Sequence, residues 1–110
     1  MVRNTRVKKI ISEVVDKIKS EYQPEKIILY GSYAYGKPNR DSDIDLFIIK
    51  DTSKNRIDRY VEVKRLIYEP TRRISVSPLV YTPNEVAKRL GMRDDFIEEI
   101  MTKGEVLYAT

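Results

Sequence analysis

Cysteine and histidine are both absent from this chain of 110 residues. The first absence excludes disulfides and thiolate metal sites, and the second removes the commonest general base and the imidazole ligand of transition metals. No apolar run reaches the roughly 18 residues of a membrane-spanning helix, and the first residues are charged, unlike a secretory signal. Any chemistry must therefore use carboxylates, hydroxyls, Lys, Arg or Tyr, and we expect a cytoplasmic protein with no membrane partner.

Charge of one sign is only slightly in excess. The chain has 21 basic and 17 acidic residues, a net charge of +4 and a pI of about 9.3. A basic balance favours anionic partners such as nucleotides, nucleic acid or an acidic protein, but a mixed solvated surface explains so small an excess equally well. A nucleic-acid-binding module, which would bind in a salt-sensitive and Mg²⁺-independent way, therefore rests on net charge alone and is not favoured.

The first third of the chain predicts a helix, a strand and a short helical turn. An apolar stripe at helical spacing predicts a helix over Thr5–Tyr22, and Pro24 ends it. The strand formers of Lys26–Tyr30 predict a buried strand that ends at Gly31. Over residues 32–36 we expect one helical turn, with Ser32 as its N-cap and Gly36 closing it in a left-handed conformation. The stripe consists of Val7, Ile10, Ile11, Val14, Val15 and Ile18.

Residues 43–49 predict a second strand with two different faces. Ile44, Leu46 and Ile48 fall on one face, while Asp43, Asp45 and Phe47 fall on the other. Both carboxylates are therefore expected to project from the same side of a sheet.

The rest of the chain predicts further alternation of helices and strands. We expect a helix over residues 53–68, ended by Pro70, with Ile57, Tyr60, Val61, Leu66 and Ile67 as an imperfect apolar stripe. Residues 74–81 predict a third strand, which should lie at an edge of the sheet or carry a bulge at Pro78, because proline cannot donate to a ladder.

The C-terminal part carries a specific helix start signal, the capping box of residues 82–85 with proline at the first helical position. A last helix is expected over residues 94–103, stopping at Gly104, and residues 106–108 predict a closing strand. The alternation predicts an α/β (α+β) fold, a small mixed sheet with helices packed on it.

Asp43 and Asp45 carry the strongest chemical signal. Two aspartates at this spacing on a strand hold their Cβ atoms about 6 to 7 Å apart on one face. Two like charges side by side at the start of an apolar strand are unfavourable without a counter-ion. Since carboxylate oxygens are the ligands that hard divalent cations prefer, the pair predicts a Mg²⁺ or Mn²⁺ site and not a Zn²⁺ site.

A second group of residues suits a phosphate. Gly31 permits close approach of the backbone at a strand-to-helix turn, and the Ser32 hydroxyl with the following N–H groups can cradle an anion. Arg40, in the loop between the two motifs, is within reach of a phosphate, although a solvated loop cation is the plainer interpretation. Ser32 is not predicted as a hydrolase nucleophile, because no Gly-x-Ser-x-Gly elbow and no activating histidine are present.

Gly31-Ser32, ten intervening residues and then Asp43-Ile44-Asp45-Leu46 resembles the signature of the DNA polymerase β-type nucleotidyltransferase superfamily. The fuller string Gly-Ser-x-Ala-x-Gly-x5-Ser-Asp-x-Asp-Leu, which includes Ser42, is similar to its minimal nucleotidyltransferase (MNT) branch. The resemblance covers nearly the whole chain in element order. It implies one nucleotidyltransferase domain over residues 1–110.

The resemblance also implies an activity. It is metal-dependent transfer of a nucleoside monophosphate, AMP from ATP, to an acceptor hydroxyl, with Asp43 and Asp45 as catalytic metal ligands. Gly31, Ser32, Arg40 and Ser42 would bind the nucleotide. Standalone members of this branch resemble the antitoxin half of HEPN/MNT toxin–antitoxin pairs, so the implied acceptor is a tyrosine on a small helical HEPN partner. A homo-oligomer is also compatible with so small a core.

The chain departs from the family pattern on the third strand. Many members carry a third carboxylate there, and alignment places Ser77 at that position, followed by Pro78; no carboxylate occurs from Thr71 to Tyr81. A serine hydroxyl neither balances metal charge nor acts as a base at neutral pH. Either a partner chain or one of Asp41, Asp51 and Glu69 substitutes, or the second metal is weakly held and turnover is slow or absent. In the last case the chain is a catalytically weak or silent antitoxin that neutralises its partner by binding.

Overall fold

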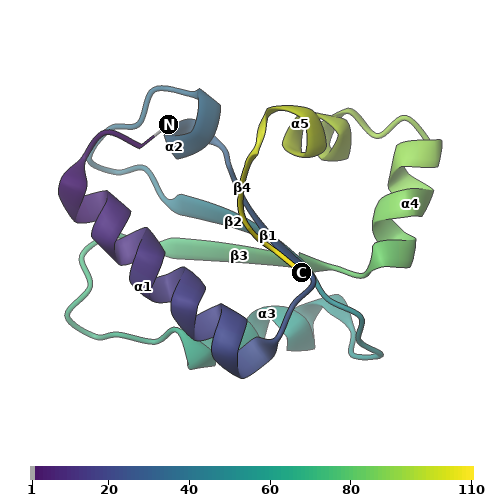
Figure 1. The fold of residues 1–110 in the computed structure, drawn as a ribbon, viewed down its shortest axis with the longest axis horizontal. Coiled ribbons are helices and arrows are strands. Elements are labelled where there is room, and N and C mark those ends of the chain that lie inside the picture. The colour runs from purple at the N-terminus through teal and green to yellow at the C-terminus, as the bar shows by residue number, and fades with distance from the viewer. Residues whose placement is uncertain (1) are drawn as a thin grey trace.

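The computed structural model describes residues 2–110 and contains one four-stranded mixed sheet in the order β3-β2-β1-β4 (Figure 1). In the centre, β1 (Lys26–Tyr30) pairs antiparallel with β2 (Ile44–Ile49) and with β4 (Glu105–Ala109). On the outside, β3 (Val76–Tyr81) pairs parallel with β2. The predicted fold class is therefore confirmed, and so is the edge position of the strand that contains Pro78.

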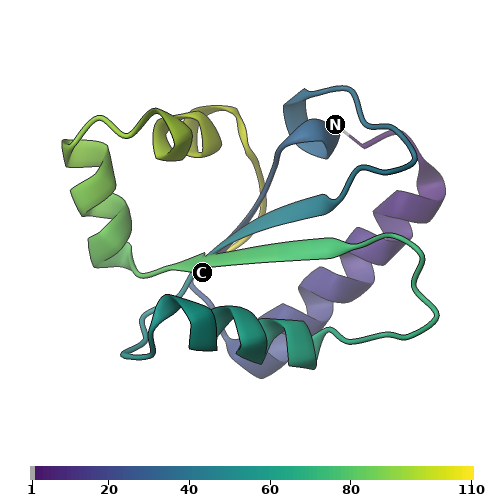
Figure 2. The same ribbon diagram turned by 180° about the vertical axis from the view of Figure 1, so that it is seen from behind.

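Helices cover both faces of the sheet. The long α1 (Thr5–Tyr22) and α3 (Arg56–Leu66) share one apolar core with one face, while α4 (Pro83–Gly91) and α5 (Asp95–Lys103) share a second core with the other face (Figures 1 and 2). The four-residue α2 (Ser32–Tyr35) lies where β1 ends. No helix within residues 2–110 has the length and apolar character needed to cross a membrane.

The two cores follow from the alternation predicted for β2. Ile44, Leu46 and Ile48 point into the α1–α3 core, and Phe47 points into the α4–α5 core. Because side chains alternate strictly along a strand, Asp45 lies on the Phe47 side. The core of one face therefore fixes the direction of the site residue on the other.

The first core also confirms the stripe predicted for α1. Val7, Ile11, Val14, Val15 and Ile18 are buried in it, and Ile10 is partly buried against it.

The predicted apolar stripe of α3 is confirmed at its C-terminal end, where Ile67 is buried and Leu66 packs against the core, but it is wrong for Ile57 and Tyr60. Its inward face is formed by Arg59 and Val63, whereas the Ile57 side chain is 74% exposed and Tyr60 also points outward. Arg59 is buried because its guanidinium donates to the Val80 carbonyl at 3.3 Å and to Glu85 Oε1 at 2.7 Å. The helix is also shorter than residues 53–68: Asn55 caps its start, accepting a hydrogen bond from the Asp58 N–H at 2.9 Å.

The cap prediction for α2 is wrong as well. The N-cap is Gly31, with φ of 76°, and its carbonyl accepts from the N–H groups of Ala34 and Tyr35. Gly36 has φ of −110° and is not left-handed. The left-handed residue therefore stands at the start of this turn, where the chain leaves β1.

Other boundaries differ from the prediction by one or two residues. The second strand begins at Ile44 and not at Asp43, and the third begins at Val76 and not at residue 74. The capping box is confirmed: Thr82 Oγ1 accepts from the Glu85 N–H, and Glu85 Oε1 accepts from the Thr82 N–H. The closing strand is confirmed and is one residue longer at each end than predicted.

Candidate active site

Gly31 and Asp45 lie against each other at the end of the sheet. Tyr30, the last residue of β1, is paired with Asp45 across the antiparallel ladder, so Gly31 follows directly beside it. A methyl group at Gly31 would collide with Asp45 Oδ2, and the positive φ of Gly31 disfavours any other residue as well. Glycine is therefore required here twice, once for backbone conformation and once for close approach of a carboxylate.

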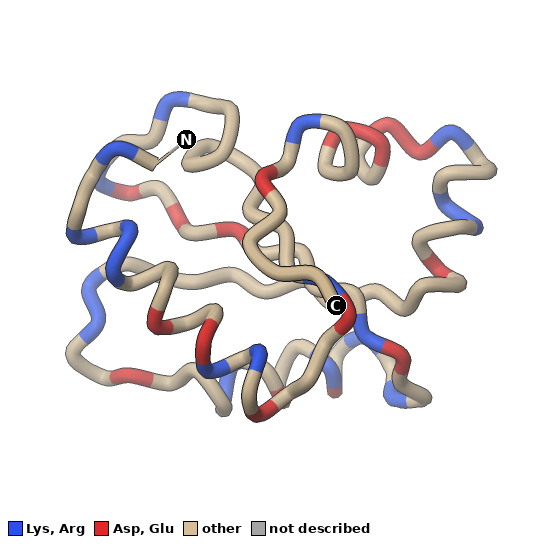
Figure 3. The backbone as a smooth tube through the Cα atoms, viewed as in Figure 1, with Lys and Arg blue, Asp and Glu red and all other residues tan. Residues whose placement is uncertain are grey.

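Asp43 and Asp45 flank a residue that is fixed in place. Ile44 between them is buried, and its N–H donates to the Ser75 carbonyl at 2.9 Å. Asp43 is exposed and Asp45 is half-buried. Figure 3 shows the acidic positions in succession where β2 begins.

Neither carboxylate of this pair has a protein partner within residues 2–110, whether a hydrogen-bond donor or a cation. Burial raises the pKa of the Asp45 carboxyl, and the charge of Asp43 raises it further. Two uncompensated carboxylates in contact with low-dielectric protein are unfavourable, and a divalent cation removes that penalty. An oxygen-only donor pair fits Mg²⁺ or Mn²⁺.

Tyr30, directly before the Gly31-Ser32 motif, is a further neighbour of the site, and the sequence predicts only a packing role for it. Its ring packs edge-on against Phe47 and Phe96, with centroid distances of 6.5 and 5.8 Å. Burial and the charge of Asp45 raise the pKa of the Tyr30 phenol to about 12. The phenol is therefore protonated at neutral pH and does not act as a base. Its position beside Asp45 follows from the pairing of β1 with β2, which the spacing of the two motifs does not predict.

Ser77 stands beside Asp45, as the alignment predicted. The two residues are direct partners in the parallel ladder between β2 and β3, so their side chains leave the same face of the sheet. Within residues 2–110, no group of three or more acidic side chains is arranged to hold a metal ion. The site that this chain builds by itself therefore contains two carboxylates and a hydroxyl.

The three proposed substitutes do not join that pair. Asp51 lies beyond the far end of β2, six residues from Asp45 and about 20 Å away at the usual rise of a strand. The Glu69 carboxylate accepts hydrogen bonds from the Thr71 N–H and hydroxyl at 3.1 and 2.9 Å, so it closes a turn. Asp41 is exposed in the loop before β2 and is not part of a metal-holding cluster.

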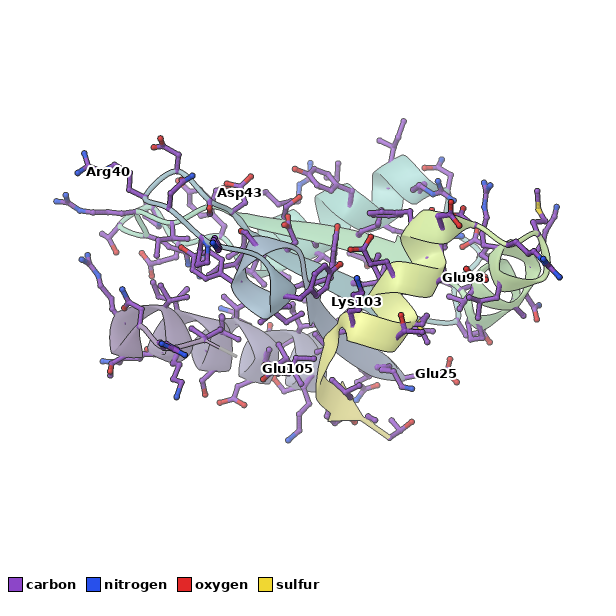
Figure 4. The ribbon with its side chains drawn as sticks, turned by 90° about the horizontal axis from the view of Figure 1, so that it is seen from above. Glu25, Arg40, Asp43, Glu98, Lys103 and Glu105 are labelled. Carbon is purple, nitrogen blue, oxygen red and sulfur yellow. The ribbon has the colours of Figure 1, made fainter. Side chains whose placement is uncertain are left out.

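The loop between α2 and β2 brings Arg40 near the carboxylate pair. Arg40 and Asp43 lie at the same end of the molecule, with Glu98 of α5 far from them (Figure 4). Ser42 has a structural role: its hydroxyl oxygen accepts from the Asn39 N–H at 2.9 Å and its own N–H donates to the Asn39 carbonyl. Ser42 therefore holds the turn that presents Arg40.

A basic groove lies between α2, the loop that follows it and the first residues of the chain. It has a volume of about 960 Å³ and includes Ser32 in its wall. Its charged lining residues are all cations, Arg3, Arg6, Lys37 and Arg40. The first two come from the start of α1, which sequence spacing alone did not connect with Ser32. This arrangement surrounds one side of α2 with positive potential and suits phosphate groups.

Comparison with known proteins gives a family-level match. Residues 11–105 match the family described as "Nucleotidyltransferase domain". Two proteins of Methanocaldococcus jannaschii, both provisionally named protein adenylyltransferases, are similar to nearly the whole chain. MJ1305 is 33% identical over 104 residues, covering 90% of this chain and 69% of its own length. MJ0604 is 30% identical over 102 residues, covering 91% of this chain and 96% of its own length.

A solved structure shares the fold. A crystal structure of a protein from Sulfolobus solfataricus, provisionally assigned as a nucleotidyltransferase, superposes with a TM-score of 0.64 at 21% sequence identity. The match covers 92% of this chain and 78% of that one. The four-stranded sheet with its flanking helices is therefore a known arrangement.

Proposed function

Because this chain belongs to the nucleotidyltransferase domain family, we propose that it transfers AMP from ATP to a hydroxyl group of a protein partner. The observation that carries the proposal is the carboxylate pair of Asp43 and Asp45, which has no protein partner within residues 2–110. The Asp45 carboxylate of this pair lies against Gly31, where β1 ends. The provisional names of the two relatives support ATP as donor and protein as acceptor.

Each residue of the site has a role in this reaction. Asp43 and Asp45 are the residues that would hold Mg²⁺ or Mn²⁺, which neutralises the triphosphate and lowers the pKa of the acceptor hydroxyl. The Ser32 hydroxyl and the N–H groups of Ser32 and Tyr33, which precede the first hydrogen-bonded N–H of α2, are available to phosphate oxygens. Arg40 adds positive charge at the same end.

The bonds exchanged are those of in-line displacement at the α-phosphorus. A bond forms between the acceptor oxygen and the α-phosphorus, and the bond to the pyrophosphate oxygen breaks. The hydroxyl proton passes to solvent, because the Tyr30 phenol stays protonated at neutral pH and so cannot accept it, and the chain has no histidine. The acceptor consistent with the family resemblance is a tyrosine of a small helical HEPN-type protein.

A transfer assay tests this proposal. With labelled ATP, Mg²⁺ and a small helical HEPN-type protein as acceptor, label should appear on that protein. Asp43→Asn and Asp45→Asn should each lower the rate by about a thousandfold or more, since both ligands are needed to hold the cation. Asp51→Asn, at the far end of the same strand, is the matched control and should leave transfer unchanged. Undiminished transfer in either site variant contradicts the assignment.

A second function is favoured by Ser77. With a hydroxyl in place of a carboxylate next to Asp45, the chain suits a silent antitoxin that neutralises its partner by binding alone. This alternative requires neutralisation to survive in the Asp43→Asn/Asp45→Asn double variant and to be independent of ATP. Loss of neutralisation in the double variant, with the complex still formed, favours the enzyme.

Restoring the third carboxylate separates the two functions further. Ser77→Asp places an acidic side chain beside Asp45 on the neighbouring strand, so an active site limited by weak metal binding should gain about tenfold or more in transfer rate. The gain should be largest at low Mg²⁺ concentration. A Ser20→Asp variant, at an exposed position near the end of α1 and remote from the carboxylate pair, controls for added negative charge.

A further inference from the structure

The outer face of α3 is apolar, and no element within residues 2–110 covers it. The Ile57 and Tyr68 side chains are each 74% exposed, Tyr60 is 43% exposed, and Val61 lies between them at helical spacing. Figure 2 shows α3 at the front of the molecule with no other element drawn over it. A contiguous exposed apolar face of this kind marks a surface that binds another protein.

The relief of this face suits a packed helix. Val61 separates two shallow grooves of about 400 and 370 Å³, the first lined by Tyr60, Val61, Lys64, Arg65 and Tyr68 and the second by Lys54, Asp58, Val61, Glu62 and Arg65. Helices pack by placing side-chain ridges into such grooves. The Lys64 ammonium does not obstruct this, because it is turned toward β3 and donates to the Val76 carbonyl at 3.0 Å.

We propose that this face binds the same face of a second copy of the chain, with the two α3 helices antiparallel about a two-fold axis beside Val61. Asp58 and Arg65 lie two turns apart on one flank of the helix, and neither side chain forms an ion pair within residues 2–110. In a two-fold antiparallel pair each flank meets its own copy in reverse order. Asp58 of each copy therefore faces Arg65 of the other.

The same axis satisfies the remaining residues of the face. Tyr60 and Lys64 lie on the opposite flank. Ile57 lies along the centre, and Tyr68, two residues beyond the end of α3, lines the groove beside Val61. The midpoints of the three pairs fall close together, between residues 61 and 63. A face that is complementary to itself about one point is the property required of an isologous interface, whereas binding a different protein does not require it.

This arrangement leaves both active sites open. The chain enters α3 from the end of β2 that is remote from Asp45, and it leaves α3 toward the start of β3 beside the site. Antiparallel α3 helices therefore place the two sites at opposite ends of the dimer. Since α3 is only 11 residues and about 16 Å long, the interface is small and the dimer should be weak, with a dissociation constant in the micromolar range.

Sedimentation equilibrium of charge-swapped variants tests the pairing. The wild-type chain should pass from monomer to dimer between about 1 µM and 1 mM. Asp58→Arg alone and Arg65→Asp alone should each weaken the dimer by about tenfold or more, because each change introduces two repulsive contacts per dimer. The double swap should restore the wild-type constant. A chain that stays monomeric, or a double swap no better than the single ones, overturns the proposal.

Disulfide trapping locates the axis. The chain has no cysteine, so Val61→Cys introduces the only thiol. Facing helices bring Cα atoms beside a two-fold axis to disulfide distance, so this variant should form a covalent dimer on mild oxidation. Met92→Cys, whose side chain is 61% exposed in the wild type and lies away from α3, is the control and should remain monomeric. If Val61→Cys forms no covalent dimer of the chain and is cross-linked only to an added helical partner protein, the face binds that partner and the proposal is wrong.

Discussion

Asp45 and Glu85 are two partly buried carboxylates at opposite ends of the sheet, and they differ in their hydrogen-bond donors and in the direction of their pKa shifts. Glu85 accepts hydrogen bonds from the Arg59 guanidinium at 2.7 Å and from the Thr82 N–H at 2.8 Å. Although burial raises the pKa of Glu85, these bonds lower it further than burial raises it. Asp45 has no such donor, and burial with the charge of Asp43 raises its pKa.

The difference separates a structural carboxylate from a functional one. The charge of Glu85 is compensated inside the fold, where it joins α3, β3 and α4 through Arg59. The charge of Asp45 is left for something outside the chain to compensate. In the proposed function, this uncompensated charge is the binding place of a cation and a triphosphate.

The largest expected effect on stability is at the Glu85 end. Arg59→Met should lower the free energy of unfolding by about 3 kcal/mol, because it removes the guanidinium that donates to Glu85 and to the Val80 carbonyl. Chemical denaturation measures this. Arg73→Met, at an exposed position, should change the free energy by less than about 0.5 kcal/mol. Equal effects in the two variants would mean that the Arg59 contacts do not compensate Glu85.

A smaller effect is expected at Gly31. Gly31→Ala should lower the free energy of unfolding by about 2 kcal/mol, through its positive φ and the collision with Asp45. Asp45→Ala in the same chain should recover the part that is due to the collision, which a double-mutant cycle measures. Gly91→Ala is the control, since a methyl group there meets nothing within 4 Å. Simple additivity of the two changes would contradict the contact.

The smallest effect is the pH dependence. Since the folded-state pKa of Asp45 lies above its unfolded value, protonation favours the folded state, and this contribution is lost as pH rises through the folded pKa. Asp45→Asn should therefore be more stable than wild type by up to about 1 kcal/mol at pH 7, with the difference vanishing in acid.

Glu85→Gln should show the reverse trend. The folded-state pKa of Glu85 is lowered, so its contribution is present above the unfolded pKa and is lost as pH falls through the folded one. Denaturation of both variants across the acidic range checks the two signs. Parallel curves for Asp45→Asn and Glu85→Gln would remove the distinction between the two carboxylates.

Much of this could be predicted from the sequence, for local reasons. The bounds of α1 and β1 were predicted to the residue, because a clean apolar stripe, Pro24 and Gly31 mark them. The placement of Asp45 beside Gly31 followed from a motif whose parts are close in sequence.

What could not be predicted depends on distant pairs. The inward face of α3 is set by Arg59, whose partner Glu85 is 26 residues away. Without that partner, the pattern favours burial of Ile57 and Tyr60, which the structure leaves exposed. The nearness of Tyr30 to Asp45 likewise depends on strand pairing. The position of the N-cap of α2 at Gly31, and not at Ser32, depends on the left-handed backbone of Gly31.

The most direct test is calorimetric titration of Mn²⁺ with a non-hydrolysable ATP analogue into the wild-type chain and into Asp45→Asn at pH 7. Wild type should bind saturably, and the variant should bind at least about a hundredfold more weakly while unfolding at an equal or higher denaturant concentration. Equal affinity in the two proteins would contradict the account, because the unpaired carboxylates would then not be the metal–nucleotide site.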